Sequence, residues 1–256
     1  MMPRRLRSIL ITLAVAILLL AGLTAFSASV LLGMLHIPRT VMADLPNTEV
    51  VQIESRDHLK LKAAWLASTA SGPTPGRCVL FLHGAGGWRG RSQRFTPWLL
   101  PAGYSVLAPD LRAQGESGGD TITYGLLEQY DTLDWTSWMH QHGCTKIFAM
   151  GESMGASILL MTAGLDPSAN VFAAIVAECP FADLLEAAQH RGQSMFPLPA
   201  VIVAPLARLA VASGSSYVQL TAGLDLTTAS PVAAIAKLQT PVLLIHGLAD
   251  TNIPPS

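Results

Sequence analysis

The feature that most constrains the fold of this chain is a five-residue stretch, Gly151-Glu152-Ser153-Met154-Gly155. A short apolar run at 146–150 precedes it and predicts a strand, and good helix formers at 156–163 follow it. A serine on such a strand-to-helix turn needs very small residues two positions away, because a Cβ there would strike the adjacent backbone. The turn raises the hydroxyl above the sheet and points the N–H groups of the helix N-terminus at the same place. The alternative is an ordinary turn that happens to contain serine.

The rest of the chain predicts a mainly parallel sheet flanked by helices. Residues 50–55 and 60–66 alternate between apolar and polar and favour an antiparallel hairpin. After Cys78, continuous apolar runs alternate with helical stretches, which is typical of strands buried on both faces of a parallel sheet. The predicted buried strands are 79–82, 104–108, 147–150, 173–177 and 242–245, and the predicted helices are about 93–100, 126–140, 154–165, 182–191 and 232–237. The fold class is therefore α/β.

Residues 181–230 form an insertion after the sixth predicted strand, longer than a simple crossover requires. We expect it to be a small helical cap over a pocket, and the alternative is an ordinary packed helix pair. The apolar part, 200–212, is predicted not to be a second membrane span, because it is short and because prolines and Arg208 interrupt it.

The N-terminus predicts a membrane anchor. Arg4, Arg5 and Arg7 precede 9–35, a run without charge that exceeds the roughly 20 residues needed to cross a bilayer. We expect 9–31 to form one continuous helix that projects from the domain and is apolar all around. A cleaved signal peptide is the alternative. The predicted organisation is an anchor at 1–36, a linker at 37–49 and the main domain at 50–256. With the arginines in the cytoplasm, the main domain lies on the outer side.

Composition excludes some classes of function. The formal net charge is −1 and no basic patch with interleaved aromatics is present, so nucleic acid is not an expected partner. Cys78, Cys144 and Cys179 are scattered and contain no C-x-x-C pair, which argues against a zinc site and a disulfide framework. We expect each cysteine to pack as a small apolar residue, with a bridge between Cys78 and Cys144 as the alternative. No metal or organic cofactor is implied.

A glycine-rich turn, His83-Gly84-Ala85-Gly86-Gly87, follows the predicted strand 79–82. Acyl transfer needs two N–H donors where negative charge develops on the carbonyl oxygen. One usually comes from the residue after the nucleophile, here Met154, and the other from this loop, here Ala85. The alternatives are a flexible glycine loop or a phosphate-binding turn, and the G-x-G-x-x-G spacing of dinucleotide sites is absent.

Four motifs in order, at 83–87, 110–118, 151–155 and 246–250, resemble the α/β-hydrolase superfamily over residues 50–256. The pattern is most similar to the branch with dienelactone-hydrolase-like and prolyl-oligopeptidase-like domains and to membrane-anchored α/β-hydrolase-domain proteins. The resemblance implies that Ser153 is the nucleophile and that Asp250 is the acid that orients a histidine. A loop or helix-capping aspartate is the alternative for Asp250. Asp110 and Arg112 are expected to brace a loop.

The chain departs from the family at the catalytic base. In this fold the histidine follows the acid after one more strand, yet no histidine occurs beyond His246. His83 and His246 belong to strand-end motifs whose usual role is structural. We therefore expect a C-terminally truncated hydrolase without its last strand and helix, nearly inactive as it stands. The alternative is an intact pseudoenzyme.

The resemblance implies a serine hydrolase that cleaves a carboxylic ester, thioester or amide through an acyl-enzyme at Ser153. A serine peptidase of the same fold and a non-catalytic binding module on the membrane surface are the other hypotheses.

Overall fold

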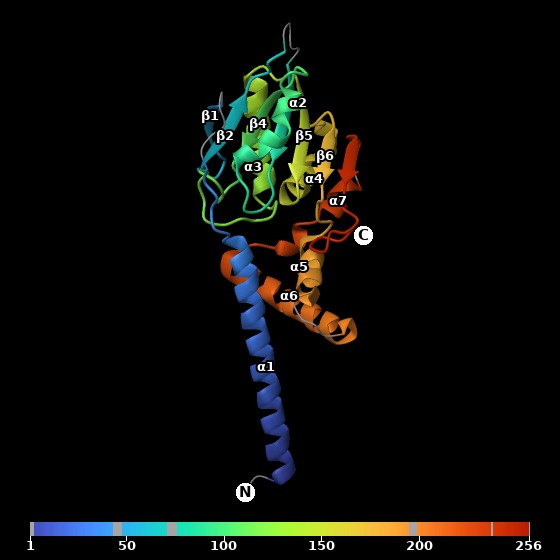
Figure 1. Ribbon diagram of the computed structural model, residues 1–256. Coiled ribbons are helices and arrows are strands. Elements are labelled where there is room, and N and C mark those ends of the chain that lie inside the picture. Colours follow the sequence, from blue (N-terminus) through green and yellow to red (C-terminus); the bar gives the residue numbers. More distant parts are fainter. Residues whose placement is uncertain (1–2, 43–47, 71–75, 195–198, 237, 256) are drawn as a thin grey trace.

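The computed structural model describes residues 3–42, 48–70, 76–194, 199–236 and 238–255. It consists of an α/β domain from which one long helix, α1 (Arg4–Leu35), projects (Figure 1).

The described residues of the domain form a seven-stranded sheet in the order β1-β2-β4-β3-β5-β6-β7. The strands are β1 (Glu49–Glu54), β2 (Lys60–Leu66), β3 (Arg77–Leu82), β4 (Ser105–Pro109), β5 (Lys146–Glu152), β6 (Ile175–Glu178) and β7 (Val242–Ile245). β2 is antiparallel to β1 and β4, and all other neighbours are parallel. This mixed, mostly parallel sheet confirms the predicted α/β fold, and β2 and β7 have the predicted bounds.

Helices flank this sheet. They are α2 (Thr96–Leu99), α3 (Glu128–Gln141), α4 (Met154–Leu165), α5 (Leu184–Ser194), α6 (Ala200–Ala222) and α7 (Pro231–Ile235), with short 3-10 helices η1 (Arg89–Arg94), η2 (Pro167–Ala169) and η3 (Leu226–Thr228). Of these, α5 and α6 lie beyond the end of the sheet, next to α1 (Figure 1). α4 is buried from Met154 to Ala163 and packs against α3 and α7, so it is the central helix. The prediction of one helix at 93–100 was wrong at its start, because η1 ends at Arg94 and α2 begins at Thr96, with Pro97 in its first turn.

Helix α1 is continuous, as predicted, and longer than 9–31 at both ends. Apolar side chains are exposed along most of its length. Its C-terminal turns are different, since Ser27, Ala28, Leu31 and Leu35 are buried and the two leucines join the hydrophobic core of the domain. The expectation of an apolar surface all around therefore holds only for the part of α1 that precedes Ser27.

Helix α6 corrects the prediction for residues 200–212. The sequence predicted an interrupted stretch too short to span a membrane, but α6 is one helix of 23 residues with Pro205 inside it. In the described part of the chain, α1 and α6 are the two helices long and apolar enough to cross a membrane, by length and composition only. Arg208 does not interrupt α6 because its side chain points to solvent, and packing against α1 and α5 supports the helix past the proline.

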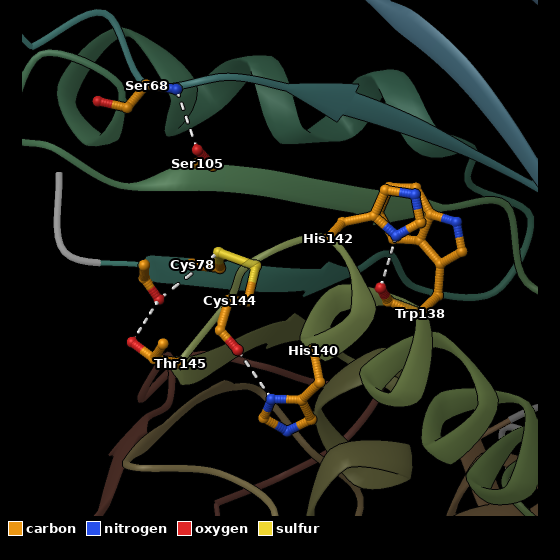
Figure 2. Close-up of a disulfide and its surroundings, with 9 residues drawn as sticks. Ser68, Cys78, Ser105, Trp138, His140, His142, Cys144 and Thr145 are labelled. Atoms are coloured by element: carbon orange, nitrogen blue, oxygen red, sulfur yellow. Dashed lines mark hydrogen bonds between the residues drawn. A yellow bond between two sulfur atoms is a disulfide. The ribbon is translucent and has the colours of Figure 1, made fainter.

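A disulfide joins Cys78 and Cys144, with 5.8 Å between their Cα atoms (Figure 2). The expectation that each of these cysteines packs as a free apolar side chain was therefore wrong. β3 and β5 are neighbours in the sheet, and Cys78 is paired with Ile147 in their register. Cys144, three residues earlier, consequently lies beside the start of β3. Cys179 is the free cysteine.

The loop after β4 is held by buried charges. Asp110 accepts hydrogen bonds from the backbone N–H of Arg89 at 2.6 Å and from its guanidinium at 2.5 Å. The Arg112 guanidinium donates to the carboxylate of Asp131 from Nε and Nη2 and to that of Asp57 from Nη1. These contacts agree with the expectation that Asp110 and Arg112 brace a loop.

Candidate active site

Ser153 lies on a tight turn between β5 and α4 with a φ of 50°, in the left-handed region that non-glycine residues rarely adopt. The turn is possible because both flanking glycines touch backbone. A Cβ on Gly151 would lie 2.6 Å from the nitrogen of Ala156, and a Cβ on Gly155 would lie 2.6 Å from the carbonyl oxygen of His83. The N–H of Ser153 donates to the carbonyl of Glu178 at 2.7 Å, which ties the turn to β6.

The loop 83–87 follows β3 and lies directly beside the serine. A Cβ on Gly84 would be 3.3 Å from the Cβ of Ser153. The N–H of Gly86 donates to Gln114 Oε1 at 2.6 Å, and that of Gly87 donates to the carbonyl of Gly84 at 3.0 Å. Among the described residues, the N–H of Ala85 has no acceptor. Met154 begins α4, where N–H groups lack intrahelical partners. Ala85 and Ser153 line one cavity and Met154 directly follows Ser153, and the oxyanion roles of the Ala85 and Met154 amides stay predictions.

His83 is fully buried and holds this loop. Its Nδ1 donates to the carbonyl of Gly84 at 2.8 Å, and its Nε2 accepts from the N–H of Leu111 at 3.2 Å. Burial lowers the pKa of the imidazole below its ordinary value of 6.5, so the ring is neutral at pH 7. Both nitrogens are occupied by backbone partners, which is the structural role expected for this residue.

Asp250 follows β7 in a turn that it stabilises itself. Its Oδ1 accepts from the N–H of Asn252 at 2.9 Å and of Ile253 at 3.0 Å. The hydrogen bond from the Ile253 backbone is the main reason that the pKa of this carboxyl lies below its ordinary value. Its Oδ2 lies 3.7 Å from Nε2 of His246, which is 2.6 Å from the carbonyl oxygen of Ile253.

Cys179, His246 and Asp250 bring ligand atoms within 4.8 Å of one another. The hydrogen bonds of His246 and Asp250 to backbone groups at 252 and 253 account for this arrangement without an ion.

The structure places the seven histidines of the chain relative to Ser153. Among the described residues, no histidine nitrogen is hydrogen-bonded to Ser153. The ring nitrogens of most histidines are engaged by backbone carbonyls or by Glu54; these are His36, His58, His83, His140, His142 and His246. His190 lies in α5.

A cavity of about 600 Å³ opens above Ser153. Ser153, Gly84 and Cys179 line it, and each follows the carboxyl end of a parallel strand (β5, β3 and β6). This is the edge at which ligands bind in open α/β sheets. A second cavity of about 450 Å³ lies at the opposite edge and contains none of the predicted site residues.

Sequence reasoning missed several residues of the cavity. Two arginines stand at its rim, where Arg94 binds Glu152 and Arg91 lies 3.3 Å from the same carboxylate. Thr40 and Met42, which follow α1 in the chain, line the cavity too, and the Thr40 hydroxyl donates to the carbonyl of Gly86 at 2.9 Å. Glu152 could have been predicted to line the cavity, because it directly precedes Ser153 in the serine motif. No local signal marked Thr40 or Met42.

The profile of the Alpha/beta hydrolase family matches residues 79–256. The chain belongs to this family. Its α/β-hydrolase architecture is also found in solved structures. An esterase from Pyrococcus furiosus superposes with a TM-score of 0.64 over 86% of this chain and 80% of that one, at 23% identity. A membrane phospholipase A superposes with a TM-score of 0.55 over 99% of this chain and 84% of that one, at 20% identity. At these identities the likeness shows the fold alone.

A curated relative is YqkD of Bacillus subtilis, an uncharacterised protein that is 33% identical over 171 residues. The match covers 64% of this chain and 52% of YqkD, so the chain spans about half the length of this relative.

Proposed function

We propose that the protein is a membrane-anchored serine hydrolase that cleaves a carboxylic ester, thioester or amide through an acyl-enzyme. The observation that carries the proposal is the left-handed turn at Ser153, closed by two glycines that cannot take a Cβ and lying beside the loop 83–87. Ser153 attacks the carbonyl carbon. The N–H groups of Ala85 and Met154 stabilise the oxyanion, and Asp250 orients a histidine.

An ester is the favoured substrate class. The solved structures with this fold include proteins named as an esterase and a membrane phospholipase A, and both names denote enzymes that hydrolyse esters. A peptidase would use the same elbow and oxyanion loop, so the choice depends on the residues that line the cavity above Ser153.

Turnover by the chain is proposed to be very low, because no described histidine is hydrogen-bonded to Ser153. A nucleophilic serine without a paired histidine keeps only the contribution of the oxyanion hole and of substrate binding, several powers of ten below a complete triad. The described histidines hydrogen-bond elsewhere, as shown for His83 and His246.

The membrane part of the proposal rests on α1. Ser27, Ala28, Leu31 and Leu35 at the end of α1 are buried and the two leucines join the core of the domain, which favours a retained anchor. Arg4, Arg5 and Arg7 at the start of α1 favour an outward orientation of the domain. The disulfide between Cys78 and Cys144 supports the same side, because disulfides persist in oxidising compartments.

A fluorophosphonate probe tests the proposed chemistry. We expect the wild-type chain to be labelled slowly and Ser153→Ala to remain unlabelled. The matched control is Ser137→Ala, which removes an exposed hydroxyl on α3 and should label like wild type. Equal labelling of wild type and Ser153→Ala, or no labelling of either, would favour the non-catalytic binding module.

A further inference from the structure

Helix α6 exposes an apolar face that no described residue covers. Val201 is 81% exposed, Leu206 52%, Leu209 47% and Leu220 86%. Along its whole length α6 contains no acidic residue and one basic residue, Arg208. Its opposite face is buried against α1 and α5 through small and branched side chains: Val203, Ala207, Val211, Gly214, Ser215 and Val218.

The contacts between α1 and α6 define the position along α1 at which the two helices cross. The Ser27 hydroxyl donates to the carbonyl of Ala210 at 2.5 Å, and a Cβ on Gly214 would lie 3.0 Å from Leu31. The middle of α6 therefore crosses α1 at Ser27 to Leu31, near the domain end of α1 and not halfway along it (Figure 1).

The length of α1 then places this crossing relative to a bilayer. Arg7 and Ser27 are 20 residues apart in one continuous helix, which is about 30 Å at roughly 1.5 Å per residue. The hydrocarbon core of a bilayer is also about 30 Å thick. With the arginines at one headgroup layer, Ser27 and the middle of α6 lie at the opposite headgroup layer.

We propose that α6 is an interfacial helix that lies in the outer headgroup layer, with Val201, Leu206 and Leu209 directed into the acyl chains. Helix α6 combines an exposed apolar face with a basic residue and contains no acidic one. This composition favours binding to a lipid surface. α6 packs directly against α1, whose exposed apolar side chains before Ser27 the proposed anchor already gives to lipid. A transmembrane α6 is disfavoured, because its middle is held at the boundary that α1 defines and not at the bilayer centre.

The interfacial helix brings the candidate active site close to the lipid. The chain passes from the end of α1 to Thr40 and Met42 in a few residues, and both line the cavity above Ser153. The carboxyl ends of β5 and β6 face the side of the domain on which α5 and α6 lie (Figure 1). The arrangement suits an amphiphilic acyl ester that enters from the bilayer, and this consequence rests on the proposed function.

Depth measurements on the full chain test the position of α6 without using activity. Every labelled chain carries Cys179→Ser, so that the two disulfide cysteines are its remaining native cysteines. One further cysteine is then added at the test position and labelled with the fluorophore NBD. The test positions are Leu209→Cys and, independently, Leu206→Cys, both exposed so that the label does not disturb packing. Leu18→Cys on α1 is the deep reference, and Gln141→Cys at the far end of α3 is the aqueous control.

The labelled chains are reconstituted in phosphatidylcholine vesicles that contain lipid quenchers with the nitroxide at carbon 5 or carbon 12. We expect NBD at 206 and 209 to be quenched more by the shallow nitroxide, NBD at 18 more by the deep one, and NBD at 141 by neither. Absence of quenching at both 206 and 209 would place α6 in water, and preferential deep quenching there would make α6 a second span. Either result overturns the proposal while leaving the chemistry at Ser153 untouched.

Discussion

The disulfide between Cys78 and Cys144 makes a quantitative prediction about stability. The two residues are 66 positions apart in sequence, so the bond closes a long loop in the unfolded chain. The loop-closure relation gives an entropy loss worth about 4 kcal/mol at 25 °C for a loop of this length. We therefore expect the double variant Cys78→Ala/Cys144→Ala to lose about 3–4 kcal/mol of unfolding free energy relative to the oxidised wild type.

The assay is urea unfolding of the detergent-solubilised chain, followed by tryptophan fluorescence. With a denaturant slope of about 2 kcal/mol per molar, the expected loss lowers the urea midpoint by roughly 1.5–2 M. Reduced wild-type chain should unfold near the double variant, while Cys179→Ala, which removes the free cysteine, should stay near the oxidised wild type. If oxidised and reduced chains unfold at the same midpoint, the loop is already constrained in the unfolded state and the reasoning fails.

Three further predictions concern the candidate site. Gly155→Ala should destabilise the chain by about 1–3 kcal/mol in thermal melts, because the added Cβ meets backbone oxygens that cannot move aside. The control is Gly192→Ala, where the nearest contact of an added Cβ is an ordinary 3.7 Å. This variant should be neutral or stabilise α5 by up to about 1 kcal/mol. Burial lowers the pKa of His83, so below pH 6.5 the unfolded chain gains a proton that the folded chain does not bind. Stability should therefore fall between pH 7.5 and 5.5, and His83→Gln should show a smaller fall; an equal fall in both chains would remove His83 as its source. A bulky maleimide on Cys179 should slow fluorophosphonate labelling of Ser153, because both residues line one cavity. Labelling of Cys179→Ser should not change when that variant is treated with the maleimide. If the modified thiol leaves the labelling rate unchanged, Cys179 lies outside the working site.

The sequence predicted those parts of the fold whose information is local. The glycines around Ser153 and the good helix formers after it predicted β5, the turn and α4, and α4 has the predicted bounds. Alternation predicted β1 and β2, and apolar runs bounded by turn residues predicted the other strands of the described residues, with differences of one or two residues at some ends. These elements depend on short-range pattern and on the steric demands of single glycines.

What the sequence could not predict depends on contacts between distant segments. The Cys78–Cys144 bond requires that β3 and β5 be neighbours, which is a property of strand order and not of either strand. Helix α6 continues past Pro205 because α1 and α5 pack against it, and propensity alone favoured a break. Thr40 and Met42 line the cavity because the end of α1 is docked on the domain. Tertiary packing decided each of these cases.

Acyl transfer to Ser153 is the central claim, and the most direct measurement is the mass of the protein after reaction with an activated ester. The full chain is incubated with p-nitrophenyl butyrate and with imidazole as an external base, then digested and mapped. We predict one butyryl group on the peptide that contains Ser153, and none on Ser153→Ala treated in the same way. A wild-type chain without an adduct at Ser153, or the same adduct persisting in Ser153→Ala, would contradict the account.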